Sequence, residues 1–388
     1  MRARTSVKAS RFTESVIREM SRLCAREGGV NLAQGFPDFP APLPMKEAAK
    51  RAIDADKNQY AVTWGAPALR QAIARRLAAY NGIPVDPERE VTVCCGATEA
   101  MIAALLATLD PGDEVVIFTP FYENYGPDCL LSGAVPRWVA LRPPEWRFDP
   151  DELARAFGPR TRAIIVNTPH NPTGKVFERA ELETIAALCR QHDALAITDE
   201  IYEYILYDGA EHVSLATLPG MAERTITVSG LSKTWSATGW RIGWAVAVPE
   251  LTLAIRKVHD FLTVGAPAPL QEAAAEALSS GPEYFAELAR AYDERRALLV
   301  GALEELGLEV HRPRGAYYVM TGIERFRRAG EDDTAFAFRL LQGGGVATVP
   351  GSSFFPDPAA GHGLIRFCFA KRLETLQRAA EILAQRLR

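Results

Sequence analysis

The chain has 388 residues, of which 48% are hydrophobic and 24% are charged, and its formal net charge is −4 at pH 7. This length exceeds what one hydrophobic core usually serves, so we expect a globular protein of at least two structural units. The acidic balance and scattered basic residues argue against a nucleic-acid partner. Because no run of eighteen apolar residues and no signal-like segment near the start is present, no membrane contact is expected.

From about residue 90 to 250, short apolar runs alternate with helical patterns. Helices are expected at 97–109 and 179–191, and the apolar runs are "EVTVCC", "DEVVIFT", "AVPRWVAL", "RAIIVNTP", "LAITDE", "TITVSG" and "IGWAVAV". Such continuously apolar runs are typical of strands buried on both faces of a mainly parallel sheet. The pattern predicts an α/β domain that binds its ligand at the carboxyl ends of the strands.

After residue 250 the pattern changes to long helices, expected at 249–261, 267–278 and 282–306. Three strand-like pieces follow, "LEVHRP", "GAYYVMTG" and "LIRFCFA", and then a last helix. We therefore expect three parts: an N-terminal arm with part of a small domain (1–40), a large domain (41–280) and a small α+β domain (281–388).

The six cysteines show no metal-binding or disulfide pattern. They are Cys24, Cys94, Cys95, Cys129, Cys189 and Cys368, and no CxxC pair occurs among them. We interpret them as reduced, mostly buried thiols of a cytoplasmic protein without a metal site.

Two glycine-containing turns follow predicted strands. In "CCGATEA", Gly96 turns the chain into a helix whose free N–H groups and dipole suit an anion, with the Thr98 hydroxyl beside them. An ordinary helix start capped by Thr98 is the alternative. In "VNTPHNPTG", two prolines and Gly174 would hold the Asn171 amide in one orientation, unless this is only a structural turn.

Two charged residues also follow apolar strands. In "LAITDEIY", Asp199 ends a buried strand, with Tyr202 three residues later, so its carboxylate needs a cation unless it caps a helix. In "SGLSKTWSATGWRIG", a partly desolvated Lys233 could form a Schiff base with an aldehyde, and Arg241 could bind phosphate. Together these features meet the binding needs of pyridoxal 5′-phosphate.

The same segments resemble a known family. "SGLSKTWSATGWRIG" is similar, position by position, to the lysine signature of class I pyridoxal-phosphate aminotransferases, and "NPTG" and "DEIY" occur in that family's order. The resemblance runs from "NLAQGFPDFP" to "LIRFCFA" and is greatest to the kynurenine, glutamine and methionine aminotransferases. It implies fold type I, in which a seven-stranded, mainly parallel sheet lies between helices beside a smaller α+β domain.

The resemblance also implies a role for each residue. Lys233 would attach the cofactor and shuttle the substrate's proton, Asp199 would pair with the pyridine nitrogen, and Asn171 and Tyr202 would bond the 3′ oxygen. Tyr122 would stack on the ring, and Arg366 would grip the substrate α-carboxylate with help from Asn171 and the Gly35 backbone, unless Arg366 forms a structural salt bridge. The phosphate would be held by Gly96, Ala97, Thr98, Arg241, either Ser229 or Ser232, and Tyr60 of the partner subunit in a homodimer.

Two departures from the family affect these expectations. Gly230 stands where many relatives carry a phosphate-binding serine, and Val264 and Gly265 replace the Phe-His pair of kynurenine aminotransferases, which predicts a pocket of different shape. No second arginine is clearly placed for a side-chain carboxylate.

We therefore expect a ping-pong aminotransferase that moves an amino group from an L-amino acid to a 2-oxo acid. The favoured donors are aromatic, methionine-like or glutamine-like, with Phe12, Tyr60 and Trp64 as candidate pocket residues. The alternatives are a carbon–sulfur β-lyase or pyridoxal-phosphate oxidase on the same scaffold, an aspartate aminotransferase, or a non-catalytic effector-binding module.

Overall fold

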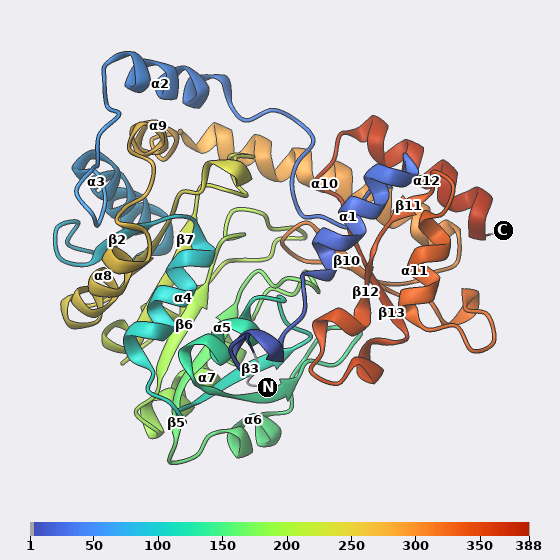
Figure 1. Cartoon of the computed structure of the whole chain (residues 1–388), viewed down its shortest axis with the longest axis horizontal. Helices are drawn as coiled ribbons and strands as arrows, with labels where there is room; N and C mark the ends of the chain where they lie inside the picture. Colours follow the sequence, from blue (N-terminus) through green and yellow to red (C-terminus); the bar gives the residue numbers. More distant parts are fainter. Residues whose placement is uncertain (1–3, 388) are drawn as a thin grey trace.

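The computed structural model describes residues 4–387 as an α/β protein with one large and one smaller sheet. In Figure 1 the large sheet and its helices occupy one side of the molecule, and the C-terminal strands and helices occupy the other. Within residues 4–387, no helix combines the length and apolar character needed to cross a membrane.

The large sheet has seven strands in the order β2-β8-β7-β6-β5-β3-β4, and each corresponds to one of the seven apolar runs. Only β8 is antiparallel to its neighbours, so the predicted seven-stranded, mainly parallel sheet is confirmed. The strands are β2 (Val91–Cys94), β3 (Glu114–Thr119), β4 (Val135–Ala140), β5 (Thr161–Asn167), β6 (Leu195–Asp199), β7 (Thr225–Gly230) and β8 (Gly243–Val246).

Strand β4 departs from the expected burial on both faces. Five of the other strands are buried at every residue and β5 at every residue except Arg162, whereas Val135 and Arg137 of β4 are exposed. Strand β4 lies at the end of the sheet and pairs only with β3, and its alternating exposure shows that one of its faces is uncovered near its start.

Helices lie on both faces of the large sheet. The predicted helices at 97–109 and 179–191 are confirmed as α4 (Ala97–Thr108) and α7 (Arg179–Gln191), while those at 249–261 and 267–278 correspond to α8 (Pro249–Thr263) and α9 (Ala268–Ala277). A proline lies in the first turn of both α8 and α9, where the missing N–H has no helical partner to lose. The remaining helices here are α2 (Leu43–Asp54), α3 (Pro67–Arg76), α5 (Tyr125–Ser132) and α6 (Pro150–Ala156).

The smaller unit is built on a four-stranded antiparallel sheet in the order β12-β13-β10-β9. The three strand-like pieces are confirmed as β9 (Glu309–His311), β10 (Tyr318–Gly322) and β13 (Leu364–Cys368), and β12 (Val349–Pro350) is an additional strand. Helices α10 (Pro282–Glu305) and α12 (Leu373–Leu387) match the predicted helix at 282–306 and the predicted C-terminal helix, and α11 (Asp333–Leu341) is an additional helix.

The N-terminal segment lies against this smaller unit. Helix α1 (Val16–Glu27) leads into β1 (Val30–Asn31), which pairs in parallel with β11 (Val346–Ala347). Figure 1 shows the blue α1 beside the orange and red C-terminal elements. The boundaries at residues 40 and 280 stay a prediction, and residues 1–3 and 388 of the predicted parts lie outside the described residues.

Candidate active site

The loops that follow β2, β5, β6 and β7 meet at one edge of the large sheet. These strands run parallel to one another, so their carboxyl ends share that edge, where open α/β sheets bind ligands. A cavity of about 380 Å³ lies there. Eleven of the predicted site residues line it: Gly35, Ala97, Thr98, Tyr122, Asn171, Asp199, Tyr202, Ser232, Lys233, Arg241 and Arg366.

Lys233 enters the cavity from the turn after β7. Its Nζ donates a hydrogen bond of 3.2 Å to the carbonyl oxygen of Gly35. Burial lowers the pKa of Lys233 from 10.5 to about 8, because a desolvated ammonium is less stable than a neutral amine. The neutral, nucleophilic amine is therefore more populated near physiological pH than in an ordinary lysine.

Asp199 ends β6 and is 6% exposed. Its Oδ2 accepts a hydrogen bond of 2.7 Å from the Tyr125 hydroxyl, and its Oδ1 accepts one of 3.3 Å from the N–H of Ile201. The carboxylate thus closes a turn and does not cap a helix. No arginine or lysine among residues 4–387 forms an ion pair with it, and burial raises its pKa, so it is suited to a cationic ligand atom.

The predicted phosphate cup lies at the start of α4. Gly96 has a φ of +85°, a backbone conformation that favours glycine, and the guanidinium of Arg241 lies where a side chain at this position would begin. The Thr98 cap proposed from the sequence is wrong: Gly96 occupies the cap position, and Thr98 lies in the first helical turn. The hydroxyl of Thr98 lines the cavity instead.

The structure separates the two serines near Lys233. Ser232 lines the cavity, whereas the hydroxyl of Ser229 donates a 2.8 Å hydrogen bond to Glu203 in the protein interior. A Cβ at Gly230 would lie 2.9 Å from the carbonyl oxygen of Ile242 and 3.0 Å from Cα of Gly243. This backbone leaves no room for a serine at position 230, so Ser232 is the better candidate phosphate ligand.

Arg366, in β13, is fully buried and lines the cavity. Its Nη1 donates to Oδ1 of Asn171 and its Nη2 to the carbonyl oxygen of Ala33, each at 2.7 Å, while its Nε has no partner in the protein. The structural salt bridge considered from the sequence is absent, since no carboxylate among residues 4–387 pairs with this guanidinium. A buried, unpaired cation of this kind is a binding site for a ligand carboxylate.

Asn171 and Tyr202, which were expected to bond the 3′ oxygen of the cofactor, also have hydrogen-bond partners within the protein. Because Oδ1 of Asn171 accepts from Arg366, its amide nitrogen is the group left to donate to a ligand. The hydroxyl of Tyr202 lies 3.0 Å from that of Tyr318, and both side chains are buried. Tyr122 lines the cavity with its ring at 82° to that of Tyr125.

Three aromatic sequence candidates do not line this cavity. Tyr60 is 86% exposed, and Trp64 stacks against the guanidinium of Arg256. Phe12 lines a separate groove between the N-terminal segment and α5. Within one chain, none of the three contributes to the pocket beside Lys233.

Sequence reasoning missed several residues that the fold brings to the cavity. Tyr125 and Tyr318 supply hydroxyls next to Asp199 and Tyr202, and Arg18 of α1 lies in the cavity wall. The "PFYENY" stretch contained Tyr125, but only the position of α5 shows that its hydroxyl meets Asp199. Arg18 is thus an arginine of the cavity wall that the sequence did not single out.

These residues fit pyridoxal 5′-phosphate. The cavity combines a low-pKa lysine for the aldehyde, an unpaired buried carboxylate for the pyridine nitrogen, and a glycine turn with Arg241 for the phosphate. The unpaired Nε of Arg366 leaves a further donor for the amino acid.

Known proteins resemble this chain over almost its whole length. The family described as aminotransferase class I and II matches residues 27–383. A probable N-succinyldiaminopimelate aminotransferase of Mycobacterium tuberculosis is 42% identical and human kynurenine–oxoglutarate transaminase 1 is 38% identical; the alignments cover 97% and 94%, respectively, of both chains. A solved Escherichia coli structure, reported to identify a methionine aminotransferase function, has a TM-score of 0.94 and 38% identity, covering 99% of this chain and 100% of its own.

Proposed function

We propose a role for each cavity residue on the basis that the chain belongs to the class I and II aminotransferases and is a pyridoxal-phosphate-dependent transaminase. Lys233 attaches the cofactor and then carries the proton that leaves the substrate Cα. Asp199 faces the ring nitrogen, and Arg366 with Asn171 holds the α-carboxylate. The fold type I architecture, enzyme class and cofactor expected from the sequence are confirmed by the family match.

When bound, the cofactor supplies an aldehyde to which amines add and a ring that withdraws electrons from the substrate Cα. The protein's task is to orient that bond and move the proton. The lowered pKa of Lys233 supports its role as a base once its amine is free, since a base works best with a pKa near the working pH. The remaining buried donors support fixed positions for the carboxylate and the phosphate.

We infer that the amino donors are aromatic, methionine-like or glutamine-like L-amino acids. Tyr122, Met101 and Ile17 give the cavity wall apolar surface, which favours an uncharged side chain. The relatives named for methionine and kynurenine support the same choice. A strict aspartate enzyme is less favoured, because this apolar surface accommodates donors that have no side-chain carboxylate.

Arg18 supports a dicarboxylic 2-oxo acid as the amino acceptor. Lys233, Arg241 and Arg366 already have roles, so Arg18 is the remaining lysine or arginine of the cavity wall among residues 4–387, and it forms no ion pair there. An acceptor gripped at its α-carboxylate by Arg366 would present its distal carboxylate to this wall. The human relative is named for oxoglutarate.

We further propose a homodimer, located in the cytoplasm, in which Tyr60 reaches the partner subunit's phosphate site. Tyr60 and Phe261 are 86% and 92% exposed, an unusual state for large aromatic side chains. They lie on neighbouring segments, because His259 donates a hydrogen bond to the carbonyl oxygen of Thr63. The cysteines are free thiols, as expected in a reducing compartment.

The observation that carries this proposal is the buried, unpaired guanidinium of Arg366 in the same cavity as Lys233. The test is a half-reaction: each L-amino acid is mixed with the cofactor-loaded enzyme without an acceptor, and the visible absorption of the bound cofactor is followed. Aromatic amino acids, methionine and glutamine should remove this absorption, and a 2-oxo acid should restore it. Release of pyruvate or ammonia instead would indicate a β-lyase, and oxygen consumption would indicate an oxidase.

A further inference from the structure

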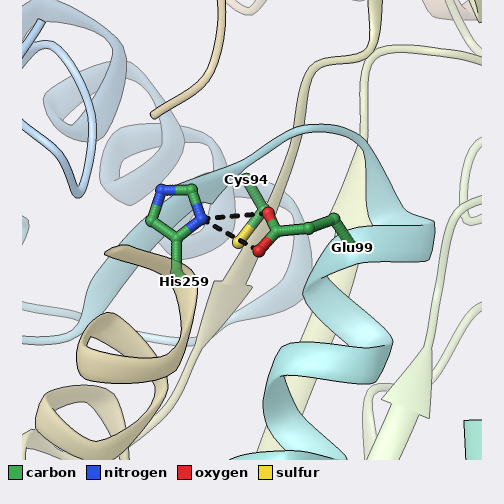
Figure 2. Close-up of side chains that lie close together, drawn as sticks. All are labelled: Cys94, Glu99 and His259. Atoms are coloured by element: carbon green, nitrogen blue, oxygen red, sulfur yellow. Dashed lines mark hydrogen bonds and ion pairs between the residues drawn. The ribbon is translucent and has the colours of Figure 1, made fainter. Parts of the chain in front are cut away.

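A buried ion pair that the proposed chemistry does not use lies directly behind the phosphate cup. Figure 2 shows Glu99 of α4 facing His259 of α8, with Cys94 of β2 beside them. His259 and Cys94 are fully buried, and Glu99 is 9% exposed. Burying such a pair requires that its charges and protons be fully matched.

The neighbours of His259 fit a doubly protonated ring. Its Nδ1 lies 2.9 and 3.0 Å from the two carboxylate oxygens of Glu99, and its Nε2 lies 2.9 Å from the carbonyl oxygen of Thr63. The Thr63 carbonyl oxygen only accepts, so Nε2 carries a hydrogen, and an ionised Glu99 carboxylate requires a second hydrogen on Nδ1. The Thr263 hydroxyl, 3.3 Å from Nδ1, can accept as well.

The other groups around the ring do not supply a competing charge. Burial raises the pKa of the Cys94 thiol well above its ordinary value and keeps it neutral, and burial also raises the pKa of Cys95. Asp260 on α8 is exposed, and its charge acts in the same direction as that of Glu99 on His259. Burial alone lowers the pKa of His259, but the hydrogen bond and charge of Glu99 outweigh it and raise this pKa above 6.5. The geometry and the direction of this shift thus both favour a protonated His259 ring beside the Glu99 carboxylate.

Glu99 is joined to the phosphate cup itself. It lies in the first turn of α4, and its Oε2 accepts a 2.9 Å hydrogen bond from the N–H of Cys95, the residue before Gly96. An unneutralised carboxylate at this point would repel a phosphate dianion bound at the same helix end. The extra proton on the histidine offsets that repulsion, and the carboxylate can still accept the hydrogen bond from the N–H of Cys95.

We propose that His259 is a positioning residue for the cofactor phosphate, which acts by neutralising Glu99 and by tying the cup to the Thr63 segment. The inference rests on the phosphate role proposed for Gly96, Ala97 and Thr98. It also connects the cup to Tyr60, three residues before Thr63, which is the residue proposed to reach the partner subunit.

The test compares cofactor retention by holoenzyme carrying His259→Gln, Glu99→Gln or both, with Cys94→Ala as a neighbour that changes no charge. His259→Gln leaves the Glu99 charge unmatched, so we expect the pyridoxal-phosphate Kd to rise about tenfold, or about 1.4 kcal/mol. Glu99→Gln should change it less, because the histidine can become neutral. The double variant should recover most of the affinity lost in His259→Gln, and Cys94→Ala should stay within about twofold of the wild type.

Pyridoxal, which lacks the phosphate, separates charge matching from a structural role. Its affinity should change little in all four variants, whereas a merely structural defect would weaken pyridoxal and pyridoxal phosphate alike. A double variant as weak as His259→Gln, or an unchanged His259→Gln, would overturn the proposal.

Two measurements on the wild-type protein guard against variants that fail to fold. Nitrogen-15 NMR of its six histidines, with the His259 signal assigned by its loss in His259→Gln, should show that this ring stays doubly protonated at pH 8. A neutral ring at His259 would contradict the assignment. One equivalent of metal retained by the purified holoenzyme would also overturn it, because a metal would then replace the proton. If the wild type transaminates but the NMR, metal or affinity measurements contradict these expectations, the inference about His259 is wrong and the proposed function is unaffected.

Discussion

The hydroxyl of Tyr125 donates a 2.7 Å hydrogen bond to Oδ2 of Asp199, although the two residues lie 74 positions apart in the chain. Tyr125 begins α5, and Asp199 ends β6. Burial raises the pKa of Asp199, and this hydrogen bond opposes the rise by favouring the charged form. Tyr125 therefore helps to keep the carboxylate ionised where the cofactor's pyridine nitrogen is expected.

Replacing Tyr125 by phenylalanine should weaken cofactor binding. A hydrogen bond to a charged group contributes about 1.5–3 kcal/mol, so we expect the pyridoxal-phosphate Kd to rise about tenfold or more. Equilibrium titration of the apoenzyme measures it. Tyr207→Phe is the control, because that buried hydroxyl bonds the carbonyl oxygen of Ala316 away from the cavity. Equal losses in both variants would show that Tyr125 acts only through stability.

Lys233→Ala should abolish covalent attachment of the cofactor and reduce transamination by roughly a thousandfold or more, because both the attachment point and the proton carrier are lost. The visible absorption of the attached cofactor should disappear. Lys175→Ala is a matched control, since Lys175 is a buried lysine that pairs with Glu181 outside the cavity. A Lys233→Ala enzyme that kept normal turnover would refute the assignment.

The rate of cofactor attachment should depend on pH with a midpoint near pH 8. Only the neutral amine attacks the aldehyde, and burial lowers the pKa of Lys233 to about 8. The rate should therefore rise as pH increases from 7 to 9 and level off above that range, as reconstitution of the apoenzyme would show. Because the charge of Asp199 favours the protonated lysine, Asp199→Asn should move the midpoint lower. A rate still rising at pH 10 would indicate an ordinary lysine.

The parallel sheet and its helices could be predicted because their signals are local. Continuous Val- and Ile-rich runs gave every strand of the large sheet, and the helix predicted at 179–191 has those same bounds. The two-residue strands β1, β11 and β12 were missed, since a strand that short leaves no periodic pattern. Their pairing depends on the N-terminal segment reaching the far end of the chain.

The site residues that lie in sequence motifs could be predicted, whereas those that reach the site only through tertiary packing could not. Lys233, Asp199 and Arg366 stand in recognisable segments, and the fold brings all three to one cavity. Tyr318 and Arg18 have no motif, because β10 and α1 reach the cavity only through the packing of the smaller unit. The Glu99–His259 pair likewise joins helices 160 residues apart.

Arg366→Gln should chiefly impair the binding of amino and 2-oxo acids. The guanidinium is expected to make two charge-assisted hydrogen bonds to the α-carboxylate, so kcat/KM should fall about 100-fold or more, largely through KM. Steady-state kinetics with the best donor measure this. Arg70→Gln is the control, because Arg70 is also buried but pairs with Glu88 elsewhere. Equal effects on KM in both variants would show that Arg366 does not bind the substrate α-carboxylate.

Arg18→Gln tests whether the cavity wall recognises the distal carboxylate of an acceptor. Arg18 forms no ion pair among residues 4–387, while the nearby Glu123 already accepts a hydrogen bond from Ser15. Losing one partly exposed charge pair should raise the KM for 2-oxoglutarate about fivefold and leave the KM for a monocarboxylic 2-oxo acid nearly unchanged. Arg22→Gln, one turn further along α1 and paired with Glu14, controls for changes in the helix.

The comparison between the two acceptors decides the role of Arg18. A rise in KM for both acceptors would mean that the arginine shapes the cavity without reading the second carboxylate. No change for either acceptor would mean that the guanidinium stays in solvent, and the acceptor would then be chosen by the apolar wall around Tyr122 and Met101. In the expected result, the ratio of the two kcat/KM values shifts about fivefold toward the monocarboxylic acid, because Arg366 serves both acceptors and Arg18 serves only one.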